Sequence, residues 1–275
     1  MNLSYQTIER TDFPIGKRYE GKVRDVYDVG KGELVIVTTD RISAFDQVLG
    51  TIPYKGQILN ELSAFWFEKT KQIVPNHFIK VIDPNISVVR KLERIPLEII
   101  VRGHFRLGDV WQELDEPIVT PTTKEKIGHD LPIDRDEIIK RKILVEEEYD
   151  RISGYALELF IFGRNLSYRL DEGFTLFDAK YEFGKDSAGN IILMDEIHTP
   201  DCSRTQGQFD KEFLREWLKK NKCGNSFPKM TNHIKRKTSS RYIKFHEVFM
   251  DKKFIPAENP TERMTENLRK EGYLK

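Results

Sequence analysis

The chain of 275 residues is long enough to bury a sizeable core, and its 45 Lys and Arg nearly balance its 44 Asp and Glu, for a net charge of +1. This balance gives no reason to expect bulk electrostatic attraction to nucleic acid or membranes. Two cysteines exclude a disulfide framework and indicate a reducing compartment. No apolar run approaches the ~20 residues of a membrane span or the core of a signal peptide. We therefore expect a cytoplasmic protein without nucleic-acid or membrane partners.

The first patterned stretch is a hairpin. Residues 21–29 (GKVRDVYDV) predict a strand, residues 30–32 a turn and residues 33–39 a return strand. Lys22 and Arg24 would share one face of the first strand, and Gly21 would let backbone N–H groups approach a ligand. Such a hairpin suits phosphate groups, although the residues alone also fit an ordinary surface hairpin.

Residues 39–46 (TDRISAFD) form a polar loop at a strand end, where ligand-binding groups are often placed. Asp40 or Ser43 could instead cap the following segment. A helix is expected to open at residues 55–60, and its apolar stripe predicts packing rather than chemistry.

Residues 95–103 (IPLEIIVRG) predict a buried strand that ends in Arg102 beside a glycine, an arrangement that fits phosphate binding. An ordinary surface arginine is the alternative. Residues 136–170 predict one long amphipathic helix, with Gly154 or Gly163 as candidate interruptions and its end at residues 171–173.

The densest set of charged residues lies at residues 175–204. Residues 176–183 alternate strictly, with Asp178, Lys180 and Glu182 on the face opposite the apolar side chains. After a turn at residues 186–190, a second strand at residues 191–194 ends in Asp195. Carboxylate oxygens with spare water positions suit Mg²⁺, which usually accompanies a nucleoside triphosphate. A half-buried hairpin with a solvated charged face is the alternative.

Two segments further along the chain each allow two interpretations. Cys202 is interpreted as a small packed residue and not a nucleophile, because no His/Asp order suggests a triad. The basic stretch at residues 229–244 could contact RNA, but we favour a solvated helix surface. Residues 259–275 support no interpretation.

The sequences DAKYEFG and DEIHTPDCSR resemble the SAICAR synthetase signatures D-x-K-x-E-F-G and D-E-x-x-T-P-D-x-S-R. GKVRDVY, TDRISAFD, PIVTPTTK and QFDKEFLREWL also resemble family segments, so the resemblance covers roughly residues 21–249. It implies an α+β, two-lobed fold with an ATP-grasp- or kinase-like nucleotide cleft. We expect a β-rich lobe with the nucleotide-covering hairpin at 1–115, and an α+β lobe with the metal hairpin and closing helices at 116–275.

The resemblance implies an ATP-dependent ligase that joins L-aspartate to the carboxylate of carboxyaminoimidazole ribonucleotide through an acyl phosphate. It implies two catalytic residues, Lys180 and Arg204. It implies nucleotide contacts from Gly21, Lys22, Arg24, Lys124, Glu182 and Asp195, the last two also holding Mg²⁺. It implies substrate contacts from Asp40, Ser43, Arg102, Asp130, Asp201, Ser203 and Arg204.

The run VRGHFRLGDVW departs from the family pattern R-G-Y-L-x-G-S-x-W by one extra residue and a missing serine. We expect Arg106 to replace that serine at the substrate phosphate, with Asp109 orienting it by a salt bridge. A diverged ligase for another carboxylate and amine stays open, as does a homo-oligomer. A non-catalytic nucleotide-binding protein is disfavoured, because binding alone does not need Lys180 beside paired metal carboxylates.

Overall fold

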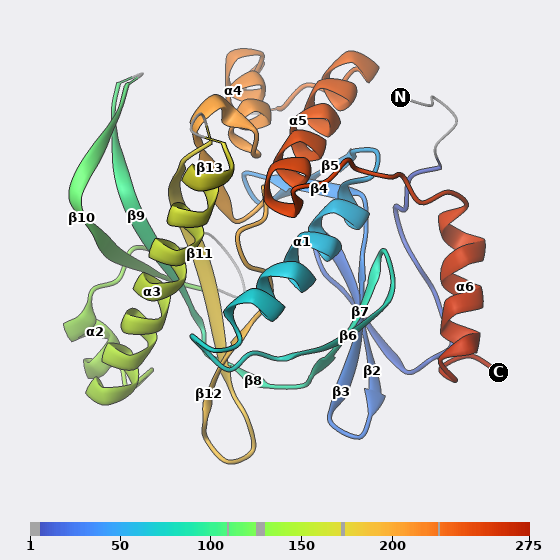
Figure 1. Cartoon of the computed structure of the whole chain (residues 1–275), viewed down its shortest axis with the longest axis horizontal. Helices are drawn as coiled ribbons and strands as arrows, with labels where there is room; N and C mark the ends of the chain where they lie inside the picture. Colours follow the sequence, from blue (N-terminus) through green and yellow to red (C-terminus); the bar gives the residue numbers. More distant parts are fainter. Residues whose placement is uncertain (1–5, 109, 125–129, 172–173, 225) are drawn as a thin grey trace. The chain divides into compact units, whose positions relative to one another are not determined.

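A computed structural model describes residues 6–108, 110–124, 130–171, 174–224 and 226–275. The elements, in chain order, are β1 (Lys17–Glu20), β2 (Arg24–Gly30), β3 (Glu33–Thr38), β4 (Arg41–Ala44), β5 (Gln47–Thr51), α1 (Lys55–Thr70), β6 (Phe78–Asp83), β7 (Ile86–Arg90), β8 (Glu93–Arg94), β9 (Leu97–Leu107), β10 (Val110–Thr123), α2 (Arg135–Lys140), α3 (Glu146–Leu170), β11 (Leu176–Lys185), β12 (Ile191–Met194), β13 (Ser203–Thr205), a 3₁₀ turn (Gln206–Gln208), α4 (Glu212–Lys220), α5 (Asn232–Met250) and α6 (Pro260–Lys270). Mixed helices and sheets confirm the α+β class (Figure 1).

The chain divides into two compact units that alternate along the sequence. Unit 1 comprises the described parts of residues 1–65, 78–91 and 208–275, and unit 2 those of 66–77 and 92–207. The single boundary expected after residue 115 falls inside β10, within unit 2. The two units are defined by contacts between segments that are distant in the sequence. Local composition does not reveal such contacts.

Unit 1 is built on a five-stranded sheet in the order β1-β2-β3-β7-β6. The expected return strand at 33–39 is confirmed as β3. The first strand is shorter than expected, because β2 begins at Arg24 and an unexpected strand, β1, precedes it. Lys22 therefore lies in the β1–β2 connection, and the expectation that Lys22 and Arg24 share a strand face was wrong.

Helix α6, in the segment that the sequence left uninterpreted, packs beside β6 and completes the core of this sheet (Figure 1). Met264 and Leu268 join the buried cluster of Tyr27 and Val35. Asp83, at the end of β6, accepts hydrogen bonds from Arg263 at 2.9 Å and 3.2 Å and from Asn267 at 2.7 Å.

We expect Arg263→Ala to lower the free energy of unfolding by about 2–3 kcal/mol, because Asp83 is fully buried and would lose its charged partner. Arg269→Ala is the matched control, since Arg269 is exposed on the same helix. Denaturant unfolding of both variants measures the difference. Equal losses would show that α6 is not held through Asp83.

Unit 2 is built on a sheet in the order β10-β9-β11-β12, with β8 and β13 also pairing with β11. Helix α3 packs along β9, β10 and β11 (Figure 1). The hairpin strands at 176–183 and 191–194 are confirmed. Both faces of β11 are covered, however, and Asp178 and Glu182 are only 4% and 1% exposed. The alternative of a solvated charged face is therefore wrong.

Three boundaries differ from expectation. β9 continues through Arg102 to Leu107, so Arg102 lies within a strand instead of at its end. The long helix is broken between α2 and α3, where Lys142 has a φ of 56°, and neither Gly154 nor Gly163 interrupts it. Helix α4 begins at Glu212, four residues after the expected start at residue 208, and Asp210 accepts the Glu212 N–H at 2.6 Å.

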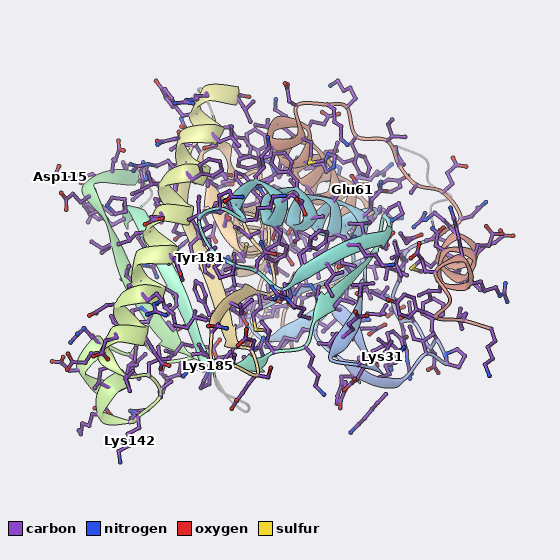
Figure 2. All side chains as sticks on the ribbon, turned by 60° about the horizontal axis from the view of Figure 1, so that its bottom comes forward. Lys31, Glu61, Asp115, Lys142, Tyr181 and Lys185 are labelled. Carbon is purple, nitrogen blue, oxygen red and sulfur yellow. The ribbon has the colours of Figure 1, made fainter. Side chains whose placement is uncertain are left out.

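Of the residues labelled in Figure 2, Lys31, Asp115 and Lys142 are exposed and Tyr181 is fully buried. Within the described residues, no helix is long and apolar enough to cross a membrane.

Candidate active site

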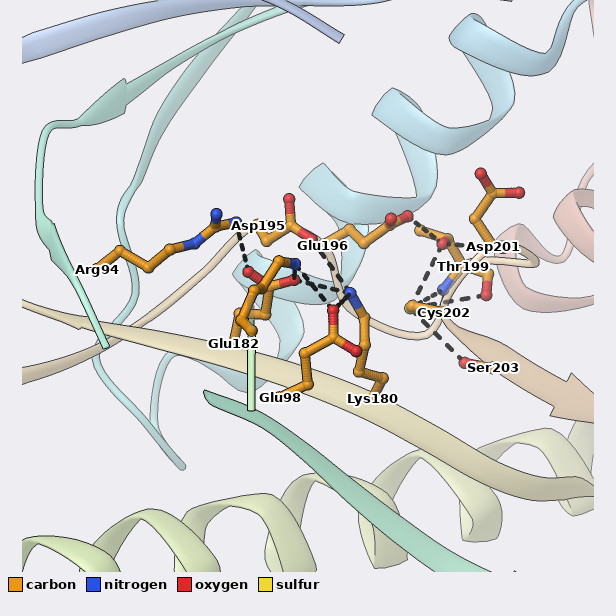
Figure 3. Close-up of polar contacts among 11 residues, drawn as sticks. Arg94, Glu98, Lys180, Glu182, Asp195, Glu196, Thr199, Asp201, Cys202 and Ser203 are labelled. Atoms are coloured by element: carbon orange, nitrogen blue, oxygen red, sulfur yellow. Dashed lines mark hydrogen bonds and ion pairs between the residues drawn. The ribbon is translucent and has the colours of Figure 1, made fainter. Parts of the chain in front are cut away.

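Six charged side chains of unit 2 meet on one face of its sheet (Figure 3). We call them the lysine–carboxylate cluster: Arg94, Glu98, Lys124, Lys180, Glu182 and Asp195. The sheet register explains their proximity. Lys180 pairs with Ile100, and Glu98 pairs with Thr122, two residues before Lys124. Alternate residues share a face, so side chains at 98, 180 and 182 project together.

Glu182 is the best-buried member and is bonded through both oxygens. Its Oε2 accepts from Arg94 at 2.6 Å. Its Oε1 accepts from Lys180 at 2.7 Å and also from Lys124. One carboxylate is thus surrounded by three cations.

A second carboxylate, Glu98, is shared by the same two lysines. Its Oε1 lies 2.8 Å from Lys124 Nζ and 3.0 Å from Lys180 Nζ. Asp195 Oδ2 lies 3.9 Å from Lys180 Nζ. Burial acts to lower the pKa of Lys180, but Glu182, Asp195 and Glu98 outweigh it and raise that pKa well above the ordinary value. Lys180 is therefore a permanent cation at neutral pH.

A row of three charges crosses neighbouring strands of the same sheet. Asp178 on β11 pairs in register with Arg102 on β9 and with Arg204 on β13. Arg204 donates from Nε to Asp178 Oδ1 at 3.0 Å and from Nη2 to Oδ2, while Arg102 Nη1 lies 3.3 Å from Oδ2. The Arg204 guanidinium also lies 5.0 Å from the Trp111 ring centroid. This arginine–aspartate row presents two partly exposed guanidinium groups, which suit a phosphate.

The chain runs from Asp195, in the lysine–carboxylate cluster, to Ser203, next to Arg204 of the arginine–aspartate row; Figure 3 shows the side chains of this connection from Asp195 to Ser203. The Thr199 hydroxyl donates to the buried Glu196 carboxylate, and Asp201 N donates to Thr199 Oγ1 at 3.3 Å. Ser203 is buried at the start of β13. Burial raises the pKa of Cys202 to about 12, which supports the interpretation of a packed, non-nucleophilic thiol.

His198, within this connection, is held by buried contacts. Its ring is fully buried, its Nε2 lies 2.6 Å from the Tyr181 hydroxyl, and it packs edge-on against Trp66. Burial lowers its pKa to about 3, so the ring is neutral. The ring rests on the backbone of α3 at Gly163, where a Cβ atom would lie 2.2 Å from it.

We expect Gly163→Ala to destabilise the protein by roughly 1–3 kcal/mol, the usual cost of overpacking. Gly154→Ala in the same helix is the control, because nothing lies within 4 Å of its added Cβ. That change should be neutral or stabilise the helix by up to about 1 kcal/mol. Thermal unfolding separates the two. A Gly163→Ala protein as stable as the Gly154→Ala protein would contradict the packing argument.

Unit 1 carries the remaining candidate nucleotide residues. Gly21 N donates to Arg24 O at 2.8 Å, which closes the β1–β2 connection. Lys22 Nζ pairs with Asp46 Oδ1 at 2.6 Å, and Asp46 occupies a two-residue turn with a φ of 61°. Their contact with a nucleotide stays a prediction.

Asp40 fits the capping alternative. It is fully buried, and its oxygens accept from Ile8 N at 2.8 Å and from Gly56 N, at the start of α1, at 2.9 Å. Ser43 lies in β4, half-buried. Substrate contact by either residue stays a prediction.

Arg106 is exposed; its Nε donates to Gly108 O at 3.0 Å, and its guanidinium lies 5.9 Å from the Trp111 ring. Asp109, expected to orient it, lies outside the described residues, as do His129 and residues 172–173. Asp130 is exposed after β10.

The donor chemistry of Glu182 and Asp195 fits Mg²⁺, because both offer hard oxygen ligands within 4 Å of one shared cation, the Lys180 ammonium. Among the described residues, no three His, Cys, Asp or Glu side chains are grouped to hold a metal. Mg²⁺ commonly binds one or two carboxylates together with substrate phosphates, so two suffice.

Sequence reasoning missed Arg94 and Glu98, and gave Asp178 no role. Glu98 had a usable signal, since it is the one charge inside the apolar run before Arg102. Arg94 had none, because only the pairing of β8 with β11 brings it to Glu182.

Lysines, carboxylates and arginines gathered on one sheet of an α+β fold suit an enzyme that handles phosphate groups. The SAICAR synthetase family model matches residues 17–230. The chain is 38% identical to the phosphoribosylaminoimidazole-succinocarboxamide synthase of Legionella pneumophila (strain Paris), over 96% of this chain and 98% of that one. The chain belongs to the SAICAR synthetase family, as its motifs predicted.

Solved structures agree. A SAICAR synthase from Saccharomyces cerevisiae complexed with SAICAR has a TM-score of 0.78 and 31% identity, covering 91% of this chain and 100% of that one. A type-2 SAICAR synthetase in complex with ADP has a TM-score of 0.74 and 27% identity, covering 87% and 100%. These likenesses confirm the predicted fold.

Proposed function

We propose a residue-level account of the activity that family membership assigns to the chain. That activity is ATP-dependent joining of L-aspartate to carboxyaminoimidazole ribonucleotide, which gives SAICAR, ADP and phosphate in purine biosynthesis. The observation that carries it is the lysine–carboxylate cluster, because two lysines and paired carboxylates on one rigid sheet suit phosphoryl transfer.

The reaction needs two displacements. The substrate carboxylate attacks the γ-phosphorus of ATP, and ADP leaves. The aspartate amine then attacks the carbonyl carbon of the acyl phosphate, and phosphate leaves with a former carboxylate oxygen while the nitrogen loses its proton. The protein's part is to position reactants and neutralise charge.

Gly21, Lys22, Arg24, Lys124 and Lys180 are the proposed phosphate contacts. Glu182 and Asp195 would hold Mg²⁺, which when bound offsets negative charge on the triphosphate. Both lysines already face carboxylates at 2.7–3.0 Å, so incoming phosphate oxygens would exchange one anionic partner for another.

Arg102, Arg106, Ser203 and Arg204 are the proposed contacts of the ribonucleotide phosphate. Asp178 orients two of these arginines through the arginine–aspartate row. Asp40, Ser43, Asp130 and Asp201 are kept as proposed substrate contacts. A cytoplasmic location is part of the proposal.

ADP release by the purified protein, with each substrate omitted in turn, tests this function. We expect continued turnover, measured as ADP released over many cycles, only when ATP, Mg²⁺, carboxyaminoimidazole ribonucleotide and L-aspartate are all present. Release that needs a different carboxylate or amine would replace the proposal by the diverged ligase, which the altered run after Arg102 favours.

A further inference from the structure

The carboxylate of Glu182 has two competing sets of partners, the proposed Mg²⁺ and the neighbouring cationic side chains. As a proposed metal ligand it must offer oxygen atoms to Mg²⁺, yet both of its oxygens are bonded to cations: Arg94 on one, and Lys124 with Lys180 on the other. Metal and nucleotide can bind together only if these cations find other anions. Phosphates can take part of that role, but ammonium groups this close to Glu182 also need a fixed anion that keeps them in place.

Glu98 is placed to be that anion. Its side chain is only 14% exposed, and one oxygen is within hydrogen-bond distance of both lysines. It projects from β9, beside β11, so the sheet holds it rigidly next to Lys180. The cluster contains three carboxylates and three cations, and Glu98 alone among the carboxylates was assigned neither metal nor substrate.

We propose that Glu98 is a positioning residue that holds Lys124 and Lys180 so that Glu182 is released to Mg²⁺, while Arg94 opposes this release. The inference rests on the proposed function. Two changes of opposite sign follow from it. Loss of the Glu98 charge leaves both ammonium groups dependent on Glu182 and the cluster one charge more positive. Loss of the Arg94 charge frees one Glu182 oxygen and leaves the cluster one charge more negative.

The test is the ratio of ADP dissociation constants without and with Mg²⁺, measured by calorimetry on the full chain. Glu98→Gln should bind metal-free ADP more tightly and lower the ratio by about tenfold, the scale of one hydrogen bond to a charged group. Arg94→Gln should raise the ratio by a similar factor. Glu68→Gln, which removes the same charge from the exposed Glu68–Lys71 pair, should leave it unchanged.

A merely structural role for Glu98 would weaken ADP binding equally with and without Mg²⁺, so an unchanged ratio in Glu98→Gln overturns the inference. A fall in the ratio for Arg94→Gln would also overturn it. If the unmutated protein does not bind ADP, or binds it equally well with and without Mg²⁺, the proposed function is contradicted, and this inference, which rests on it, is contradicted as well. Circular dichroism and thermal unfolding of each variant establish that the compared proteins are folded.

Discussion

Asp195→Asn is expected to reduce ligase turnover by roughly a thousandfold or more while leaving the fold intact. The charge of Asp195 is proposed to hold Mg²⁺, and metal stabilisation of a phosphoryl-transfer transition state contributes several kcal/mol, about tenfold in rate per 1.4 kcal/mol. Asparagine preserves the backbone, because Asp195 has a φ of 70°, a left-handed value that asparagine tolerates well. Steady-state kinetics at saturating Mg²⁺ measures the loss.

The matched control lies on the same hairpin. Asp186 occupies the turn between β11 and β12, where its Oδ1 accepts from Ala188 N and Asn190 N, both at 2.9 Å. An asparagine oxygen can accept the same bonds, so Asp186→Asn should turn over normally. Normal turnover by a folded Asp195→Asn protein would contradict the assignment of Asp195 as a ligand of Mg²⁺.

Arg204→Ala is expected to lower kcat/KM for the ribonucleotide by about a hundred- to a thousandfold and to leave ADP binding unchanged. Arg204 is fixed by two hydrogen bonds to Asp178 and lies against Trp111. A guanidinium held in this way is already oriented, so binding of a phosphate would need little further ordering of this side chain. Arg204→Lys should recover little activity, because an ammonium cannot make paired bonds from a planar group.

Arg106→Ala is the comparison within the same site. Arg106 is exposed and bonded to the Gly108 carbonyl through one nitrogen, so its loss should cost about ten- to a hundredfold, the scale of one hydrogen bond to a charged group. A larger loss at Arg106 than at Arg204, or weakened ADP binding in Arg204→Ala, would contradict the placement of the phosphate at the arginine–aspartate row.

Sequence patterns predicted the elements whose signals are local. The alternation at 176–183 and the apolar run at 191–194 correspond to β11 and β12. The same alternation misjudged burial, because the charged face of β11 is covered and its charges are paired across strands. Pairing partners are set by sheet register, which a single sequence does not encode in any short window.

Residues whose roles depend on distant strands were therefore hardest to predict. Glu98 reaches Lys180 across 82 positions of sequence, and Arg94 reaches Glu182 across 88. The break before α3 follows from a left-handed residue at Lys142, where no glycine or proline marks it. Helix α6 was not predicted as a core element, because its few apolar residues become buried only by packing against the unit 1 sheet.

The central claim is that the reaction passes through an acyl phosphate, and the most direct test follows an oxygen atom of the substrate carboxylate. Carboxyaminoimidazole ribonucleotide labelled with ¹⁸O in its carboxylate would be converted with ATP and L-aspartate, and the released phosphate analysed by mass spectrometry. Attack by the carboxylate on the γ-phosphorus places one labelled oxygen in the bridge of the acyl phosphate, and the amine expels it with phosphate. The account predicts one ¹⁸O atom in each phosphate released. Phosphate without label, at full formation of the amide, would contradict it.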